Sequence, residues 1–143
     1  MIILDTNVIS ELMREEPNAN VQEWISRQKP VRLAITTIAI AEIQRGLARL
    51  PQGKRRSRLK QSFENFLSEV FEGRIFNFDR EAAYTYGDIA AKREQDGFNT
   101  DAVDLMIASI AKSRNAAIAT RNTKDFEGCG IKIINPWSRF GLK

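Results

Sequence analysis

Short apolar runs alternate along this chain with longer amphipathic segments, and this alternation restricts the fold more than any other feature. The runs cover residues 1–4 (MIIL), 31–37 (VRLAITT), 74–79 (RIFNFD), 116–120 (AAIAT) and 131–137 (IKIINPW). Runs of this length between turn signals are typical of buried strands. Strands that alternate with helices favour a parallel sheet covered by helices on both faces. We therefore expect an α/β fold with three layers and five parallel strands in the central sheet.

Helical periodicity and helix-breaking residues locate the segments between these strands. We expect helices from Asn7 to about Met13, around residues 21–25, from Thr37 to the break at Pro51, between Gly53 and Gly73, from Glu81 to about Gln95, and from Asp101 to about Ser113. Thr37 and Thr100 are the expected N-caps of two of these helices, because a threonine hydroxyl accepts hydrogen bonds from first-turn amides. With 143 residues, the chain has the length of one domain, residues 1–143.

The composition excludes several kinds of site. The chain has no histidine and a single cysteine, Cys129, so it cannot contain a Ser-His-Asp triad, a Cys-His nucleophile, an internal disulfide or a cysteine zinc site. A metal site in this chain would use oxygen ligands, which favour Mg²⁺ or Mn²⁺. No apolar run approaches the roughly 20 residues that span a bilayer, and the N-terminus lacks the pattern of a signal peptide. We expect a cytoplasmic protein without membrane contact.

Carboxylates follow the ends of several predicted strands. Asp5 comes directly after the first strand, Glu42 lies five residues past Thr37, and Asp125 lies shortly after the fourth strand. Asp104 lies in the first turn of the helix that precedes the fourth strand, in an otherwise uncharged segment, AVDLMIASIA. Because ligand sites of parallel sheets lie beyond the carboxyl ends of the strands, we expect these acids to gather at one edge.

Each acid also has an ordinary structural explanation. Asp5 could cap the first helix, and Glu42 could pair with Arg45 one turn further along. Asp101 is an acid in the first turn of a helix, where the helix dipole favours it, and Asp125 could lie on an exposed turn. For Asp104 this reading is weakest, because a charge in an apolar segment needs a partner and a cation would supply it.

Several carboxylates at one edge, without histidine, favour a hard divalent cation and phosphoryl-transfer chemistry. A bound metal polarises the phosphate and lowers the pKa of a water ligand. Hydroxyl groups could orient the water or the phosphate. The expected supporting residues are Thr6, Asn7, Asp101 and Thr120.

The positive charge is concentrated in one segment. No acid lies between Ile43 and Phe63, and this segment contains seven bases: Arg45, Arg49, Lys54, Arg55, Arg56, Arg58 and Lys60. Such a run can attract a polyanion, or it can simply be a solvated helix face. Beside an acidic metal site, it favours the binding of a polyanionic phosphate substrate, because such a substrate needs both features.

Four blocks of the chain resemble the PIN-domain superfamily, and more closely the VapC and FitB group of type II toxins. The blocks are MIILDTNVIS, ITTIAIAEIQRGL, AVDLMIASIA, and ATRNTKDF followed by INPW. They appear in the family order, and the resemblance covers essentially the whole chain. It implies a PIN-like fold as a single PIN domain over residues 1–143. It also implies a Mg²⁺- or Mn²⁺-dependent ribonuclease whose central acids are Asp5, Glu42 and Asp104.

The resemblance also bears on the metal ligands. Asp5 and Asp104 are expected to hold one Mg²⁺, which Mn²⁺ could replace. Glu42 is either a further ligand or the residue that orients the attacking water. Members of the family commonly place a fourth acid just after the fourth strand. The corresponding residue here is Asn122, and the nearest carboxylate is Asp125, so either is a candidate for the fourth position and the number of metals stays open.

The resemblance further implies a cognate, VapB-like antitoxin, a homodimer, and contact with promoter DNA only through the antitoxin. The implied substrate is RNA, often transfer RNA. Two alternatives stay open: a nucleic-acid-binding module that acts within a toxin–antitoxin complex on DNA, and a PIN nuclease of RNA processing without an antitoxin. Apolar residues of the early helices, Leu12, Trp24 and Ile25, could line a partner groove or belong to the core.

Overall fold

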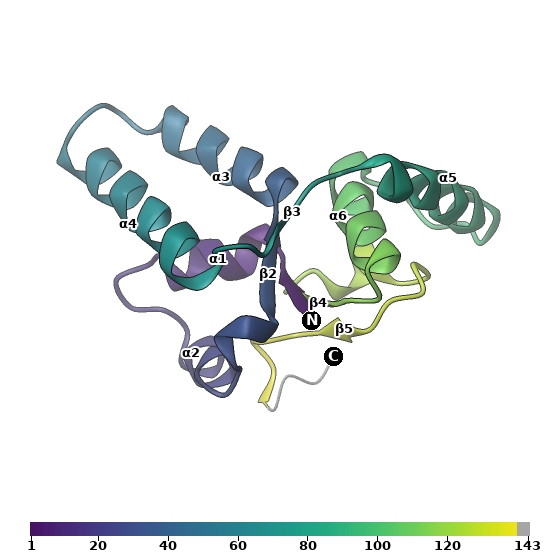
Figure 1. Cartoon of the computed structure of the whole chain (residues 1–143), viewed down its shortest axis with the longest axis horizontal. Helices are drawn as coiled ribbons and strands as arrows, with labels where there is room; N and C mark the ends of the chain where they lie inside the picture. The colour runs from purple at the N-terminus through teal and green to yellow at the C-terminus, as the bar shows by residue number, and fades with distance from the viewer. Residues whose placement is uncertain (140–143) are drawn as a thin grey trace.

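A single five-stranded sheet forms the centre of the computed structural model, which describes residues 1–139 (Figure 1). The strand order is β3-β2-β1-β4-β5, and every pairing between neighbours is parallel. The strands are β1 (Ile2–Leu4), β2 (Leu33–Thr36), β3 (Ile75–Phe76), β4 (Ala117–Ala119) and β5 (Ile133–Ile134). The prediction of five parallel strands is confirmed. The last four residues of the expected domain, 140–143, lie outside the described part of the chain.

The strands are shorter than the apolar runs that predicted them, because the ends of the runs leave the ladder for turns and helices. Residues 30–32, which include the first two of the second run, form a short 3₁₀ helix, η1 (Pro30–Arg32). Thr37 ends that run in sequence but is already the first residue of a helix. The central register pairs Ile3 with Ala34 on one side and with Ile118 on the other.

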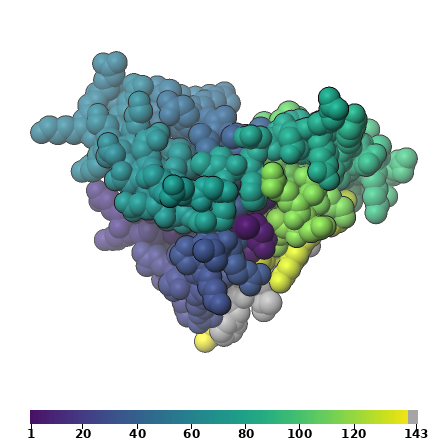
Figure 2. All heavy atoms as spheres, in the orientation of Figure 1, coloured from purple at the N-terminus to yellow at the C-terminus, as the bar shows by residue number. Residues whose placement is uncertain are grey.

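Helices cover both faces of the sheet and complete three layers. They are α1 (Thr6–Leu12), α2 (Ala19–Ser26), α3 (Thr37–Arg49), α4 (Lys54–Val70), α5 (Arg80–Gln95), α6 (Ala102–Ser113) and the 3₁₀ helix η2 (Thr123–Phe126). Figure 1 shows α1 to α4 on one side of the strands and α5 and α6 on the other. In Figure 2, α3 and α4 form one lobe and α5 and α6 another, with a notch between them. No helix within residues 1–139 is both long and apolar enough to cross a membrane.

Alternation along the strands divides the core between the two faces. Ile2 and Leu4 of β1 pack into the cluster beneath α1 to α4, whereas Ile3 packs into the cluster beneath α5 and α6. All three side chains are buried. Successive strand residues point to opposite faces, so a three-residue strand serves both clusters. This explains why every residue of β1 is apolar, rather than alternating with polar residues.

The two predicted threonine N-caps are wrong by one residue each. Thr36, the last residue of β2, caps α3 by accepting a hydrogen bond from the Ala39 amide at 3.1 Å. Asp101 caps α6 by accepting from the amides of Val103 and Asp104. A cap must keep extended backbone angles directly before the first helical residue, and this requirement selects Thr36 over Thr37 and Asp101 over Thr100.

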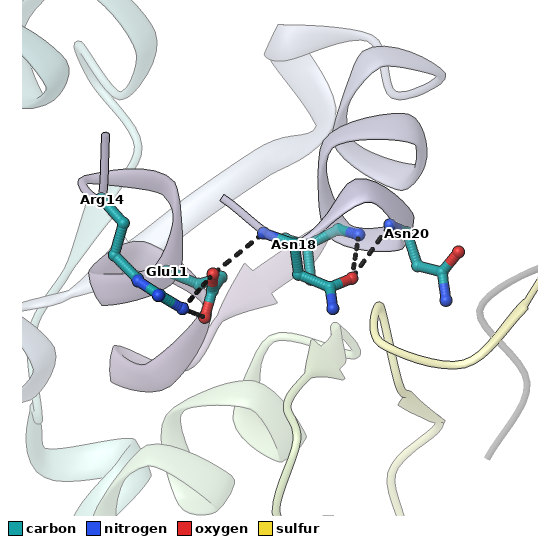
Figure 3. Close-up of polar contacts among 5 residues, drawn as sticks. Glu11, Arg14, Asn18 and Asn20 are labelled. Atoms are coloured by element: carbon teal, nitrogen blue, oxygen red, sulfur yellow. Dashed lines mark hydrogen bonds and ion pairs between the residues drawn. The ribbon is translucent and has the colours of Figure 1, made fainter. Parts of the chain in front are cut away.

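A buried glutamate fixes the connection between α1 and α2 (Figure 3). The Glu11 side chain is only 8% exposed. Its carboxylate accepts hydrogen bonds from the Arg14 guanidinium at 3.0 Å and from the Asn18 amide at 2.9 Å. Asn18 in turn caps α2, because its side-chain oxygen accepts from the Asn20 and Val21 amides. One carboxylate therefore sets the path by which the chain leaves α1 and enters α2.

Three apolar residues of these early helices belong to the core rather than to an open groove. Trp24 is buried, and Leu12 and Ile25 are partly buried and pack against the same cluster beneath α1 to α4. Of the two roles left open by the sequence, the structure favours the core.

Candidate active site

Asp5 lies at the carboxyl end of β1, where its amide extends the sheet by donating to the Ala119 carbonyl at 2.9 Å. The residue is only 3% exposed. One carboxylate oxygen accepts from the Thr6 amide at 2.8 Å. The other accepts from the Thr120 hydroxyl at 2.8 Å and from the Asn7 side-chain amide at 3.3 Å. Asp5 therefore caps α1, as considered from the sequence, and also belongs to a polar cluster.

The ionised form of Asp5 is disfavoured despite these three donors. Burial raises its pKa from 3.8 to about 6. Hydrogen bonds from Thr120 and Thr6 oppose this rise, and the charges of Glu42 and Asp125 add to it. A carboxylate that is desolvated and close to like charges gains strongly from a bound cation.

Asp104 reaches the same cluster from the first turn of α6. Its pKa rises from 3.8 to about 7, first because of burial and then because of the charges of Asp5, Asp101, Asp125 and Glu42. Within residues 1–139, no hydrogen-bond donor or ion pair contacts the Asp104 carboxylate. This half-buried carboxylate therefore has no partner in the described part of the chain.

Small residues further along α6 let this helix pack directly on the sheet. Ala108 and Ala111 are fully buried, within the cluster that also contains Ile118 of β4. Because neither alanine holds the helix away from the strands, the first turn of α6 places Asp104 close to the end of β1.

Glu42 approaches from α3 and is tied to α1. Its carboxylate accepts a hydrogen bond from the Thr6 hydroxyl at 2.6 Å. The alternative of an ion pair between Glu42 and Arg45 is wrong, since no such pair exists among the described residues. Glu42 is exposed, in contrast to Asp5, so its carboxylate faces solvent at the rim of the cluster.

The remaining acids and the amide lie on the periphery. Asp101 is the N-cap of α6 rather than a residue of its first turn, and its charge raises the pKa of Asp104. Asp125 is exposed on η2, yet its charge acts on both Asp5 and Asp104. The Asn122 backbone N–H donates to the Thr120 hydroxyl at 3.0 Å, and the Asn122 side chain makes no hydrogen bond with another described residue.

A small polar network joins the ends of β1 and β4. The Asn7 side-chain amide donates to the Thr120 hydroxyl at 3.3 Å, and its carbonyl oxygen accepts from the Arg121 backbone amide at 3.2 Å. Thr120 is fully buried. Asn7 and Thr120 therefore hold the Asp5 carboxylate and also fix the turn that follows β4. The structure thus brings two of the predicted supporting residues to the Asp5 carboxylate.

Two residues of the same edge were not predicted from the sequence. The Arg121 guanidinium lies over the Trp137 ring, 5.3 Å from its centroid. The signal was present in the segments TRN and NPW, each of which follows a strand. Only the adjacency of β4 and β5 shows that these segments meet.

The donor set at this edge fits a hard divalent cation. In the described part of the chain, no three acidic, histidine or cysteine side chains are arranged to hold a metal ion by themselves. Two carboxylates with raised pKa values, Asp5 and Asp104, lie within electrostatic reach of one another. Mg²⁺ is commonly bound by one or two carboxylates while it keeps several waters, so the pair is sufficient for this ion.

A cavity extends from this edge toward the basic run. It has a volume of about 910 Å³ and lies between α1, α3 and α4. Thr6 and Glu42 line it together with Arg55 and Arg58 of α4. The structure therefore brings two of the seven predicted RNA-binding bases to the same cavity as two predicted site residues. The other five are outside its lining: Arg45, Arg49, Lys54, Arg56 and Lys60.

Comparisons with known proteins show the family to which this chain is similar. A family model described as the PIN domain matches residues 2–129. The VapC ribonuclease Y4jK of Sinorhizobium fredii is 40% identical over 96% of this chain and 98% of its own length. Toxin FitB of Neisseria gonorrhoeae is 36% identical over 96% of this chain and 99% of its own length.

The similarity extends to three dimensions. A solved structure of FitAB bound to the IR36 DNA fragment contains a chain that superposes with a TM-score of 0.92 and 35% sequence identity. The match covers 100% of this chain and 98% of that chain. Sequence and fold therefore point to the same group of proteins.

Proposed function

The chain belongs to the PIN-domain family, and on this premise we propose that it is a metal-dependent endoribonuclease, the toxin of a type II toxin–antitoxin pair. Its relatives include a VapC ribonuclease and the toxin FitB. The observation that carries the proposal is the pair of desolvated carboxylates, Asp5 and Asp104, at the carboxyl edge of the sheet. Two adjacent carboxylates whose ionised forms are disfavoured are suited to binding a cation.

Asp5 and Asp104 would hold Mg²⁺, for which Mn²⁺ could substitute. When bound, this ion would polarise the phosphate and lower the pKa of a water. Thr120 and Asn7 keep one Asp5 oxygen in a fixed direction through their hydrogen bonds. Asp125 is the better candidate for the fourth position, because its charge reaches both central carboxylates, whereas Asn122 is neutral.

Glu42 is suited to handle the attacking water. It is exposed at the rim, and the Thr6 hydroxyl holds one of its oxygens at 2.6 Å. The second oxygen is thereby oriented to accept a proton as the water oxygen bonds to phosphorus and the bond to the leaving ribose oxygen breaks. Glu42 would therefore act as the general base, or as the group that orients the water.

The partners follow from the relatives. The FitAB neighbour was solved bound to DNA. We infer a cognate VapB-like antitoxin for this chain, contact with promoter DNA through that antitoxin, and a toxin homodimer. The inferred substrate is RNA, with transfer RNA as the class to test first, and the inferred place of action is the cytoplasm.

A second candidate function is a nucleic-acid-binding module that acts mainly within such a complex on DNA. The DNA-bound FitAB neighbour favours it. It predicts metal-independent binding of nucleic acid by the isolated chain, without cleavage. A PIN nuclease of RNA processing would instead cleave RNA and have no antitoxin.

The test is cleavage of total cellular RNA by the purified chain without antitoxin, in Mg²⁺, in Mn²⁺ and in chelator. Asp104→Asn is the inactive variant. Asp88→Asn is the matched control, because Asp88 is an exposed acid on α5 and no hydrogen bond or ion pair is found for it among the described residues. We expect discrete fragments from the wild-type chain and Asp88→Asn, and none from Asp104→Asn or in chelator. Equal cleavage by Asp104→Asn would refute the proposal.

A further inference from the structure

The turn after β4 carries an arginine whose charge is not neutralised by the acids beside it. Arg121 is exposed, and none of the ion pairs in residues 1–139 involves it. Its backbone amide donates to Asn7, whose own side chain contacts Asp5. The base of the Arg121 side chain is thus two hydrogen bonds from the central carboxylate of the site.

Trp137 holds the other end of this side chain. The indole lies beneath the guanidinium at 5.3 Å. The Trp137 amide donates to the Asn135 side chain at 3.0 Å, and its carbonyl accepts from the Asn20 side chain of α2 at 2.8 Å. The aromatic platform is therefore braced from β5 and from α2, and it restricts where the guanidinium can lie.

Among residues 1–139, no hydrogen bond or ion pair occupies the guanidinium donors of Arg121. A guanidinium can lie over an aromatic ring and still bind a phosphate bidentately through its planar fork of N–H donors. A lysine at this position would keep the charge but lose this fork. The chemistry of this pair is that of a site for a phosphate group of a polyanion.

The strand order places this pair opposite the basic run. Asp5 follows the central strand β1, α3 follows β2 on one side, and Arg121 and Trp137 follow β4 and β5 on the other side. The bases Arg55 and Arg58 line the cavity on the α3 side. A strand of RNA that crosses the acid cluster would therefore meet a cationic contact on each side.

We propose that Arg121, whose guanidinium lies over the Trp137 ring, is a substrate-positioning residue that binds an RNA phosphate on the β4–β5 side of the acid cluster. This proposal rests on the proposed ribonuclease function. Contacts on both sides of Asp5 hold the intervening phosphodiester over the carboxylates. Loss of one contact would weaken substrate binding more than it slows the chemical step.

The test compares Arg121→Gln with Arg114→Gln. Arg114 is a matched control, because it also lies over an aromatic ring, that of Phe76 at 3.8 Å. It follows α6, about 15 Å beyond Asp104 along the helix axis at 1.5 Å per residue. Both changes remove one positive charge and one stacked arginine. The probe is bulk transfer RNA, and binding is measured against salt concentration in the Asp104→Asn background, which prevents cleavage.

We expect Arg121→Gln to weaken binding about tenfold at moderate salt and to reduce the slope of log affinity against log salt by roughly 0.7 to 1. Arg114→Gln should change neither. In the cleavage-competent chain, Arg121→Gln should raise KM with little change in kcat. Arg121→Lys, which keeps the charge and loses the planar fork, should restore the slope and only part of the affinity.

Equal effects of Arg121→Gln and Arg114→Gln would overturn the proposal, because they would reflect net charge alone. Unchanged binding of transfer RNA by Arg121→Gln would also overturn it. If Arg121→Gln lowers thermal stability, the affinity of Arg121→Lys for transfer RNA decides whether the guanidinium is needed. A lysine variant with full stability and full affinity would contradict the need for a stacked guanidinium. Failure of the ribonuclease function is a separate result, seen as no metal-dependent cleavage by the wild-type chain.

Discussion

Replacing Asp104 with asparagine should stabilise the metal-free protein while abolishing its activity. The Asp104 carboxylate is half-buried, is close to four other acids, and has no hydrogen-bond donor among the described residues. Asparagine has nearly the same shape and no charge. The change therefore removes an electrostatic penalty and sacrifices no contact that the described part of the chain makes with this carboxylate.

The pKa of Asp104 sets the size of the effect. A rise from 3.8 to about 7 is roughly three pKa units, which at about 1.4 kcal/mol per unit sets an upper bound near 4 kcal/mol. Solvent at this half-buried position reduces that value to roughly 1–2 kcal/mol. Loss of an acid from the first turn of α6 costs about 0.5 kcal/mol in helix-dipole energy. We expect a net gain of roughly 1 kcal/mol, or about 2–4 °C in Tm.

The sign of the pH dependence follows from proton binding. Because the folded-state pKa lies above the unfolded value, the folded chain binds more protons than the unfolded chain between about pH 4 and 7. Stability therefore falls as the pH rises through this window, and the penalty is complete above pH 7. The advantage of Asp104→Asn should be full at pH 8 and smaller at pH 5.

The assay is thermal unfolding in chelator at pH 5 and pH 8, with Asp88→Asn as the control for a simple change of net charge. Adding Mn²⁺ should raise the Tm of the wild-type chain and leave that of Asp104→Asn nearly unchanged, which reverses their order. If Asp104→Asn shows no gain at pH 8, or the same gain at both pH values, the acid cluster does not destabilise the metal-free fold and the reasoning fails.

Three further predictions concern other parts of the molecule. Thr120→Val removes a donor to Asp5, so the pKa of Asp5 should rise further. The cleavage rate should fall about tenfold, and the acid limb of the pH–rate profile should move to higher pH. Thr100→Val is the control, and an unchanged pH–rate profile of Thr120→Val would count against the role of the Thr120 hydroxyl. Arg93 is buried and donates to the Glu127 and Asn99 carbonyls. Arg93→Leu should therefore lower the free energy of unfolding by about 2–4 kcal/mol in urea denaturation, and a loss below roughly 0.5 kcal/mol would contradict a stabilising role of these two hydrogen bonds. Neutralising the basic run of α4 should weaken binding of bulk transfer RNA and flatten the dependence of its affinity on salt concentration. The variants carry glutamine at Lys54, Arg55, Arg56, Arg58 and Lys60. An unchanged slope would assign the run to solubility.

Much of the architecture could be predicted from the sequence, because it depends on local periodicity. Continuous apolar runs and helical spacing between them predicted a parallel sheet with five strands, and the structure confirms it. Asp5, Glu42 and Asp104 could be singled out for a related reason. Strands that run parallel end at one edge, and a helix that leads into such a strand begins at that same edge. Asp5 and Glu42, which follow strands, and Asp104, which begins the helix before β4, therefore converge without any knowledge of the strand order.

Other features depended on backbone angles at single residues. Thr36 rather than Thr37 caps α3, because only Thr36 keeps an extended conformation directly before the helix. Glu42 bonds Thr6 of another helix rather than Arg45 of its own, because the α1–α3 contact brings the hydroxyl within 2.6 Å. Propensity and spacing describe what a segment can do, and neither measures which of two competing partners lies closer.

The tertiary structure alone decided what lies beside the acid cluster. Arg121 and Trp137 are 16 positions apart and belong to segments without a common periodicity. They meet because β4 and β5 are neighbours in the sheet, and that order is set by how all the helices pack. The raised pKa values of Asp5 and Asp104 have the same origin, since burial and the approach of like charges are properties of the folded chain. The sequence determined which chemical groups reach this edge. Packing determined their neighbours, and therefore how readily the Asp5 and Asp104 carboxyl groups ionise.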